Sequence, residues 1–353
     1  MLAAAEKFER RRDENRGAKV RLDANAQEQE QQQDLREESA AAFLKAAADP
    51  LRLRVLRLLR QDAMGVSELC DLLAVRQPAL SHHLKVLSGA GLLRSERDGN
   101  HIFYRRSDVD RSLALATLQQ AVLATADQLE LDQETLARLN ILQKTRELNS
   151  RNFFKQNVQK FREQQDLIAA PVRYAEAVEE LVTSLSATGS GTALELGPGE
   201  GWLLPILGLH FETVHAVDNA EVMLDAAQRT VDQTGLKNIK FHLGDSSGAF
   251  IDEIDADLVV LNMVLHHTAE PKRTLSEAVR CVKPGGALLI TELCEHKQGW
   301  ARESCGDLWL GFAPTLLEEW AGSAGMLEQS SSYLGQRNGF TLQVRLFQRA
   351  PLS

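Results

Sequence analysis

Three glycines at alternate positions, Gly197, Gly199 and Gly201, follow an apolar run at residues 192–196. Glycines in the turn between a strand and a helix allow the backbone to approach a ligand closely. Asp218 ends the next apolar run, about twenty residues further along, where a carboxylate can accept hydrogen bonds from two ribose hydroxyls. These residue types and their spacing predict a nucleotide-binding turn.

Further glycine and polar segments end the later apolar runs in the same half of the chain. Gly244 and Asp245 end the third run, Asn262 ends the fourth, and a Lys-Pro-Gly-Gly segment at residues 283–286 turns into the fifth. A dinucleotide-dependent dehydrogenase is the competing interpretation of the glycine turn. However, Trp202 stands where the third glycine of the GxGxxG pattern belongs, which disfavours that interpretation.

The order of these motifs resembles that of the class I S-adenosylmethionine-dependent methyltransferases over about 160 residues. The resemblance implies S-adenosylmethionine, or S-adenosylhomocysteine, as the ligand. It implies that the glycine turn holds the methionine part, that the residues after the second strand hold the ribose, and that later residues lie at the adenine. The cofactor-binding residues implied are Glu195, Gly197, Gly199, Gly201, Asp218, Asn219, Met223, Asp245, Ser246 and Asn262.

The sequence carries no signature that identifies the methyl acceptor. It lacks both the Asn-Pro-Pro-aromatic motif of amino-group methylation and the Pro-Cys nucleophile used on cytosine, which disfavours a DNA methyltransferase. Transfer to a good nucleophile needs mostly positioning and one base at most. His266, His267, Glu292 and His296 are the candidate bases near strand ends, although a structural role is more typical of each alone. The catalytic residues therefore stay unassigned.

The four cysteines are too few to staple a chain of 353 residues, which predicts reduced thiols and a cytoplasmic protein. Cys281, Cys294 and Cys305 have no paired spacing, so an arsenite methyltransferase is disfavoured. Cys70 stands alone among residues 65–70, and residues 107–130 contain no histidine. We therefore predict no metal site, and leave open whether any cysteine binds a metalloid.

Residues 41–110 have the pattern of a helix-turn-helix followed by a hairpin. Asp49 and Pro50 begin one helix, Ser67 is the expected cap of a short helix at residues 68–74, and Pro78 begins another at 79–89. Two apolar segments at 92–95 and 102–105 flank the turn 97–100 and predict a β-hairpin wing.

This stretch resembles the winged helix-turn-helix of the ArsR/SmtB repressors. The matching segments are Ala-Asp-Pro-Leu-Arg at 48–52, Ser-Glu-Leu at 67–69, residues 77–87, and Gly-Leu-Leu at 91–93, with Tyr104 in the wing. The family implies a homodimer on a palindromic operator of double-stranded DNA. Arg52, Arg57 and Arg60 are expected only to solvate a helix face. The expected DNA-binding residues are Gln77, Ala79, Ser81, His82 and Lys85 on the helix, and Arg94, Arg97 and Arg105 on the wing.

Charge is divided unevenly along the chain. The formal net charge is −9 overall, but it is +3 over residues 41–110 and −9 over residues 190–353. DNA affinity depends on local neutralisation of phosphates, so the basic segment is compatible with DNA binding. The acidic half is expected to face away from DNA.

The chain divides by composition into four parts. Residues 1–40 are a polar tail, expected to be disordered or a frayed helix, and 41–110 are the DNA-binding domain. Residues 111–185 are a helical dimerisation or linker region. Residues 186–353 are the methyltransferase domain, an α/β Rossmann-like parallel sheet with an antiparallel final hairpin that Asn338 and Gly339 signal. The seam residues expected in the linker are Leu115, Leu118, Val122 and Leu129, and the expected strands are 192–196, 213–217, 239–243, 258–262, 287–291 and 341–347.

The sequence thus predicts a multidomain protein, with a mainly α winged helix-turn-helix joined by long helices to the methyltransferase domain. No apolar run is long enough for a transmembrane helix, and residues 1–16 lack the apolar segment of a secretory signal. One function hypothesis is a regulator whose DNA binding responds to S-adenosylmethionine or S-adenosylhomocysteine. The alternative is a bifunctional regulator with an active methyltransferase, whose small-molecule methyl acceptor is the inducer.

Overall fold

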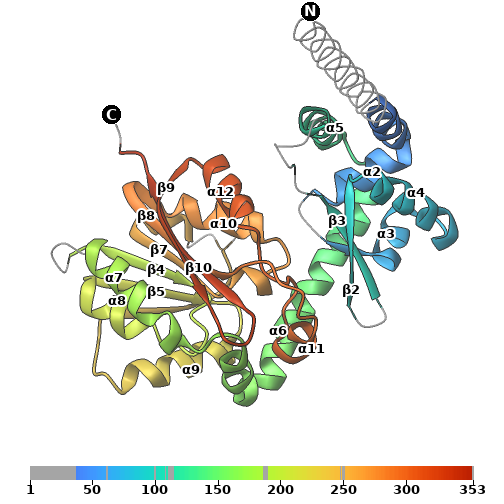
Figure 1. Ribbon diagram of the computed structural model, residues 1–353. Coiled ribbons are helices and arrows are strands. Elements are labelled where there is room, and N and C mark those ends of the chain that lie inside the picture. Colours follow the sequence, from blue (N-terminus) through green and yellow to red (C-terminus); the bar gives the residue numbers. More distant parts are fainter. Residues whose placement is uncertain are drawn as a thin grey trace, which may run out of the picture. The chain divides into compact units, whose positions relative to one another are not determined.

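The computed structural model describes residues 37–60, 63–98, 101–107, 109, 115–185, 190–246, 248 and 251–351. Contacts divide the chain into two compact units, Met1–Leu136 and Ala137–Ser353, and each is described by itself. The polar tail expected at residues 1–40 falls almost entirely outside the described residues. Figure 1 shows the elements of both units, coloured along the sequence.

The first unit contains the predicted helix-turn-helix. Helix α2 (Pro50–Leu58) begins as expected, because the Asp49 carboxylate accepts the Arg52 backbone N–H at 2.9 Å. The expected Ser67 cap is wrong. Helix α3 (Val66–Leu73) begins earlier, with Gly65 as its N-cap, and the Glu68 carboxylate accepts the Gly65 N–H at 2.8 Å. Helix α4 (Gln77–Gly89) follows, with Pro78 in its first turn.

A three-stranded antiparallel sheet follows the helices. It contains β1 (Met64–Gly65), β3 (His101–Arg106) and β2 (Leu93–Asp98), in that order. The strands of the predicted wing run further than expected, to Asp98 and from His101, so residues 97 and 98 belong to β2 rather than to the turn. Gly99 and Asn100 are not among the described residues.

Helix α5 (Ala116–Gln128) is fastened to α2 by arginines. Arg57 donates to the Leu129 carbonyl at 3.1 Å, and Arg60 pairs with Asp127 at 3.3 Å. Arg52 donates to the Ala46 carbonyl at 2.6 Å. The expectation that these three arginines only solvate a helix face is therefore wrong, because each ties α2 to a neighbouring segment. The expected seam residues of α5 and its flanks are half-buried, and their part in a dimer stays a prediction.

The second unit is a seven-stranded sheet in the order β6-β5-β4-β7-β8-β10-β9. Strands β4 to β8 are parallel, and β10 runs antiparallel between β8 and β9. The predicted strands and the final hairpin are confirmed. The strands are β4 (Thr192–Leu196), β5 (Thr213–Asp218), β6 (Ile239–Leu243), β7 (Ala256–Asn262), β8 (Val282–Leu293), β9 (Met326–Gly335) and β10 (Thr341–Arg349).

The predicted final hairpin requires a strand before its turn, but the bounds of that strand, β9, were not predicted from the sequence. It contains the run Ser330, Ser331 and Ser332, which reads as a loop because serine is not enriched in strands. The strand pairs along its length with β10, and most of its side chains are exposed.

Helices cover both faces of this sheet (Figure 1). Alternate residues of β4 point to opposite faces, so Ala193 packs in one core and Leu194 in the other. Helices α7, α8 and α9 contribute to the first core or pack beside it, and α10 and α12 contribute to the second. The bounds are α7 (Ala175–Leu185), α8 (Leu204–His210), α9 (Glu221–Asp232), η2 (Ile251–Glu253), η3 (Leu265–His267), α10 (Pro271–Arg280), α11 (Trp300–Cys305) and α12 (Pro314–Ser323).

A long helix, α6 (Gln133–Ala169), precedes the sheet and is continued by the short η1 (Pro171–Arg173). It contains 37 residues. It begins just before the boundary between the two contact units, and most of it belongs to the second. Within the described part of the chain, no helix combines the length and apolar character needed to cross a membrane.

Candidate functional site

A cavity of about 850 Å³ lies in the second unit, where the parallel strands β4, β5, β6 and β7 end. The carboxyl ends of parallel strands are where open α/β sheets bind ligands. Eight of the ten residues predicted to hold the nucleotide line this cavity. They are Gly197, Gly199, Asp218, Asn219, Met223, Asp245, Ser246 and Asn262. Glu195 and Gly201 do not line it.

The glycine turn shapes the cavity by close approach. Gly197 has φ +69°, and a Cβ there would lie 2.3 Å from Val264 Cγ2. Gly201 has φ +76°, and its Cβ would lie 2.9 Å from the Cα and Cβ of Ala227 on α9. Gly201 therefore allows α9 to pack against the turn, which is a different role from the ligand contact expected of it.

Two buried carboxyl groups lie at the ends of β4 and β5. Burial raises the pKa of Asp218 to about 6, although hydrogen bonds from the backbone N–H groups of Ala220, Asn219 and Gly199 lower it. Burial and the charge of Asp218 raise the pKa of Glu195 to about 8. Glu195 is fully buried, and neither of its carboxyl oxygens has a hydrogen-bond partner. An unsatisfied buried carboxyl group of this kind is a signal of a functional site.

Helix α6 forms a wall of the cavity that the sequence did not predict. A polar stripe on one face of α6 forms this wall. The charged residues Glu270, Arg273 and Glu277, on α10 and its N-cap, extend the wall. The helical spacing of the stripe was visible in the sequence, but a polar face normally indicates contact with solvent. The α6 residues in the cavity wall are Asn140, Gln143, Lys144, Glu147, Leu148, Ser150, Arg151, Phe154, Gln165 and Asp166.

Specific bonds fasten α6 beside the ends of the strands. Gln143 donates to the Glu270 carboxylate at 2.9 Å, and the Ser150 hydroxyl donates to the His267 carbonyl at 3.1 Å. The Phe154 ring meets the His267 ring edge-on, with 5.0 Å between centroids. A ligand in the cavity would therefore lie against a helix that these contacts fasten to the segments after the strands.

The four candidate bases do not converge on the cavity. Only His267 lines it, whereas His266, Glu292 and His296 are buried and do not. His296 accepts the Gln298 N–H at 3.3 Å, and burial, with the positive charges of His266 and Arg302, lowers its pKa to about 4.

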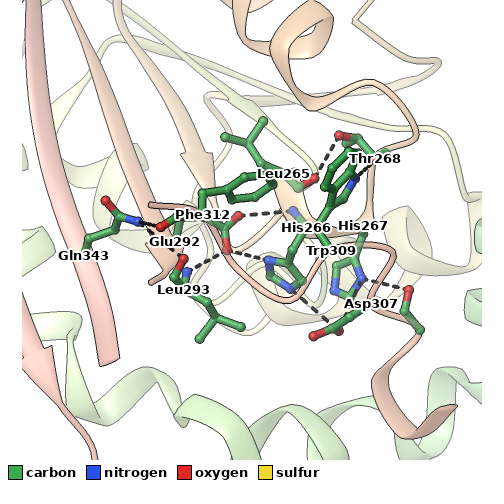
Figure 2. Close-up of polar contacts among 11 residues, drawn as sticks. Leu265, His266, His267, Thr268, Glu292, Leu293, Asp307, Trp309, Phe312 and Gln343 are labelled. Atoms are coloured by element: carbon green, nitrogen blue, oxygen red, sulfur yellow. Dashed lines mark hydrogen bonds and ion pairs between the residues drawn. The ribbon is translucent and has the colours of Figure 1, made fainter. Parts of the chain in front are cut away.

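Figure 2 shows the cluster around His266 and His267. His266 Nδ1 lies 2.6 Å from Glu292 Oε1, and its backbone N–H donates to the other carboxylate oxygen at 3.2 Å. Burial alone would lower the pKa of His266, but the charges of Glu292 and Asp307 outweigh it and raise the pKa to about 9. Burial and the charge of His266 hold the pKa of His267 well below its usual range.

The cysteines form no site together. All four are free thiols, and Cys281 and Cys305 are buried. Among residues that the structure describes, the one grouping of three or more metal-ligating side chains contains no cysteine.

In the first unit, the predicted DNA-binding face of α4 is exposed. Gln77, Ala79, Ser81, His82 and Lys85 all reach solvent, while Leu80, Leu84 and Leu87 are buried on the opposite face. His83 turns toward the Asp49 carboxylate, 3.5 Å away. In the wing, Arg94 and Arg105 face each other across β2 and β3, and both are half-buried. Arg97 lies in β2, but its side chain is outside the described set.

Comparisons with known proteins agree with this division. Residues 49–95 match the model of the bacterial regulatory protein arsR family, and residues 194–290 match that of a methyltransferase domain. The chain is 41% identical over 71 residues to the HTH-type transcriptional repressor SmtB of Mycobacterium tuberculosis, which is 20% of this chain and 53% of that protein. It therefore spans about half the length of this relative.

Two further relatives match different halves of the chain. An uncharacterized HTH-type transcriptional regulator of Methanocaldococcus jannaschii is 41% identical over 68 residues, which is 19% of this chain and 76% of that protein. A protein-L-isoaspartate O-methyltransferase of Pyrococcus abyssi is 29% identical over 98 residues, which is 28% of this chain and 43% of that protein.

Among solved structures, N-methyltransferase NodS from Bradyrhizobium japonicum, in complex with S-adenosyl-L-homocysteine, aligns with a TM-score of 0.41 and 18% identity, covering 54% of this chain and 97% of that chain. From the arsR-family match and the repressor relatives, together with the methyltransferase match, we conclude that the chain is an ArsR-family transcriptional regulator fused to a class I methyltransferase domain.

Proposed function

We propose that the methyltransferase domain binds S-adenosylmethionine or S-adenosylhomocysteine, and that the bound nucleotide modulates the binding of the winged helix to DNA. The observation that carries the proposal is the cavity at the strand ends, with Asp218 and the glycine turn on one side and α6 on the other. Its volume of about 850 Å³ is within the range of small-molecule sites.

The residues of the cavity fit this ligand. Gly197 lines the cavity where a side chain would collide with Val264, so its bare backbone can face the amino-acid part of the ligand. The Asp218 carboxylate can accept both ribose hydroxyls. Met223 and Ser246 line the cavity where the adenine would lie. Glu195 does not line the cavity, but it lies in β4 two residues before Gly197, and its buried carboxyl group without hydrogen bonds suits a ligand that carries an ammonium group.

The helix α6 supplies a route for the regulation. It lines the cavity and is continuous with residues 133–136, which belong to the first contact unit. A ligand that contacts α6 differently in two arrangements of that helix would shift their populations, and DNA affinity with them. The basic segment at residues 41–110 is the part that would neutralise phosphates, as a homodimer on a palindromic operator.

Active methyl transfer to a small molecule is the second candidate function. S-adenosylmethionine would supply an electrophilic methyl group when bound. His267 lines the cavity and is the one candidate base placed to accept a proton from an acceptor there. The charged wall formed by α6 and α10 would select and orient a polar methyl acceptor. Under this second candidate function, the acceptor is also the inducer of the regulator.

Fluorescence anisotropy on DNA from upstream of the gene tests the first proposal. The full-length protein is titrated alone, with S-adenosylmethionine, and with S-adenosylhomocysteine. We expect the nucleotide to change DNA affinity by about 5- to 150-fold, the usual range of allosteric coupling. Specific DNA binding with no change would contradict the regulatory proposal and favour the enzyme.

A pair of variants tests the site assignment. Asp218→Ala should weaken nucleotide binding by about 10- to 150-fold, the loss expected of hydrogen bonds to a charged group, and leave ligand-free DNA affinity unchanged. Asp225→Ala, an exposed residue on α9, is the matched control and should behave as the wild type. A full nucleotide response in Asp218→Ala would show that the site is elsewhere.

A further inference from the structure

We propose that His266, His267 and Asp307 form a binding site for a divalent transition metal of the zinc class, directly behind the cavity wall. The ligating atoms that these three residues offer all lie within 4.8 Å of one another, and all three residues are buried. This site goes beyond the proposed nucleotide function and does not depend on it. Figure 2 shows the three side chains together, from η3 and from the segment that follows α11.

The distances are close to those of a three-residue metal site. Asp307 Oδ1 lies 4.0 Å from His266 Nε2 and 3.8 Å from His267 Nδ1. Tetrahedral zinc with bonds of about 2.0–2.2 Å places its ligand atoms about 3.4 Å apart. The two distances to Asp307 would each contract by about half an ångström to reach that geometry. The two imidazole nitrogens, which lie within 4.8 Å of each other, would also have to approach.

Glu292 supplies the outer partner that such a site needs. Histidines that bind metals almost always donate their other ring N–H to a carboxylate or carbonyl, which fixes the tautomer. His266 Nδ1 lies 2.6 Å from Glu292 Oε1, so its Nε2 is the atom directed to Asp307. Glu292 is itself held, because it accepts the backbone N–H groups of His266 and Leu293.

Asp307 is the independent observation that points to an ion. Its side chain is 3% exposed, and neither carboxylate oxygen has a hydrogen-bond partner. A buried carboxylate is costly unless it is hydrogen-bonded, paired or bound to a metal, and the ion pairs that Asp307 makes with His266 and His267 are long. The distances of 4.0 and 3.8 Å to the histidines are too long for hydrogen bonds but leave room for an ion among the three groups.

The identity of the metal follows from the ligands. Two imidazoles and one carboxylate suit zinc and its first-row neighbours, whereas calcium and magnesium prefer oxygen ligands alone. His267 Nδ1 lies 3.3 Å from the Gly306 carbonyl, and a metal at this nitrogen would replace that contact. His267 belongs both to this cluster and to the cavity wall, so the metal would fix the orientation of a ring that lines the cavity.

Metal titration of the full-length protein tests the proposal. After treatment with a chelator and dialysis, Co²⁺ is added, and the visible absorption of four-coordinate Co²⁺ is followed before Zn²⁺ is added to displace it. We expect saturation near one Co²⁺ per chain and complete displacement by Zn²⁺. Asp307→Asn and His267→Gln should each weaken Zn²⁺ binding at least a hundredfold, and Glu292→Gln by about 10- to 100-fold.

Two control variants test whether the metal binds instead at another histidine pair or at a thiol. His215 Nδ1 lies 2.9 Å from His242 Nε2 on β5 and β6, so His215→Gln removes that pair. Cys70→Ser removes the lone thiol of the first unit. Both should bind Zn²⁺ as the wild type does, and loss of binding in either would overturn the assignment.

The proposal is wrong if the wild type binds no Co²⁺ or Zn²⁺, in which case the cluster is an ion-pair network only. It is also wrong if Asp307→Asn binds with wild-type affinity. Circular dichroism establishes whether each variant folds. Should Asp307→Asn not fold, His267→Gln decides, because an imidazole replaced by an amide leaves no buried charge unpaired.

Discussion

Gly201 and Gly235 have the same backbone conformation but different surroundings. Both have φ +76°. A Cβ added at Gly201 would lie 2.9 Å from Ala227, whereas a Cβ added at Gly235 would have no atom within 4 Å. The two positions therefore separate the cost of a left-handed backbone from the cost of a collision. At Gly201 the collision is with α9, which begins three residues after the end of β5.

We expect Gly201→Ala to destabilise the protein more than Gly235→Ala. The left-handed conformation costs about 1 kcal/mol or somewhat more in both variants. Overpacking adds about 1–3 kcal/mol at Gly201 alone. Urea unfolding followed by circular dichroism measures both losses. Equal losses would show that α9 moves aside without cost.

The pH dependence of nucleotide affinity is a second prediction for a single residue. Burial raises the pKa of Asp218 to about 6, and its ionised form is the one that accepts ribose hydroxyls. A proton on Asp218 competes with the ligand, so the contribution of Asp218 to the affinity should be constant above about pH 7 and fall below about pH 6. The fall is at most about tenfold per pH unit for one group.

Isothermal titration with S-adenosylhomocysteine between pH 5 and 8, at about half-unit steps, measures this dependence. Asp218→Asn is the control, and its affinity should be weak and lack the fall below pH 6. Any dependence that remains in that variant belongs to Glu195, whose pKa is raised to about 8. An affinity that rises on acidification would contradict the assignment of Asp218.

The individual site residues differ in how far the sequence predicts them. The positions of Gly197 and Asp218 in the cavity wall were predictable because both stand at a strand end, in a motif of fixed spacing. The cluster of His266, Glu292 and Asp307 was not, because its members lie 26 and 15 residues apart and meet only when η3, β8 and the segment after α11 pack together. Spacing along the chain carries no information about such a meeting.

At the scale of elements, α6 ends against the final hairpin. Asn338 donates from its amide to the Leu167 and Ile168 carbonyls, at 2.6 and 2.8 Å, and accepts the Phe340 N–H at 3.2 Å. The last carbonyls of a helix have no partner within the helix, so this side chain caps α6 from a distant part of the sequence. Asn338 was predicted only as a turn residue, because nothing local shows that α6 ends beside it.

We expect Asn338→Ala to loosen the end of α6. The loss of these hydrogen bonds should cost about 1–3 kcal/mol and increase amide exchange near residues 165–170. Hydrogen exchange followed by mass spectrometry measures the effect. Gln348→Ala, which removes one exposed bond to the Gly285 carbonyl, is the control and should leave α6 unchanged. Unchanged exchange in Asn338→Ala would mean that packing alone holds the helix end.

At the scale of the whole molecule, the division of charge along the chain follows the division into a DNA-binding segment and a methyltransferase half. The DNA-binding segment carries +3 and the methyltransferase half −9, so the net charge of the chain describes neither part. Fold class, domain order and the positions of most strands along the chain were predictable, because hydrophobic periodicity and glycine turns are local features of the sequence. The cavity wall from α6 was not, because a polar stripe looks the same whether it faces solvent or a ligand.

The edge strand β9 has a consequence for solubility. It pairs only with β10 among the described strands, and Leu327 and Tyr333 on it are 64% and 50% exposed. An exposed edge with apolar side chains is a template for pairing with another chain. The three serines lie between these two residues. Their small polar side chains disfavour the addition of a hydrophobic strand from another molecule.

We expect the double variant Ser330→Val/Ser332→Val to aggregate on prolonged incubation below its melting temperature. Valine raises β propensity and hydrophobicity on an open edge, which favours the addition of strands from other molecules. Light scattering followed over time measures the aggregation. Ser330→Lys/Ser332→Lys should stay clear, and equal behaviour of both variants would remove the edge as the cause. The serine run that conceals β9 in the sequence would thus also protect the protein, because a segment that is weakly marked as a strand is a poor nucleus for intermolecular sheets.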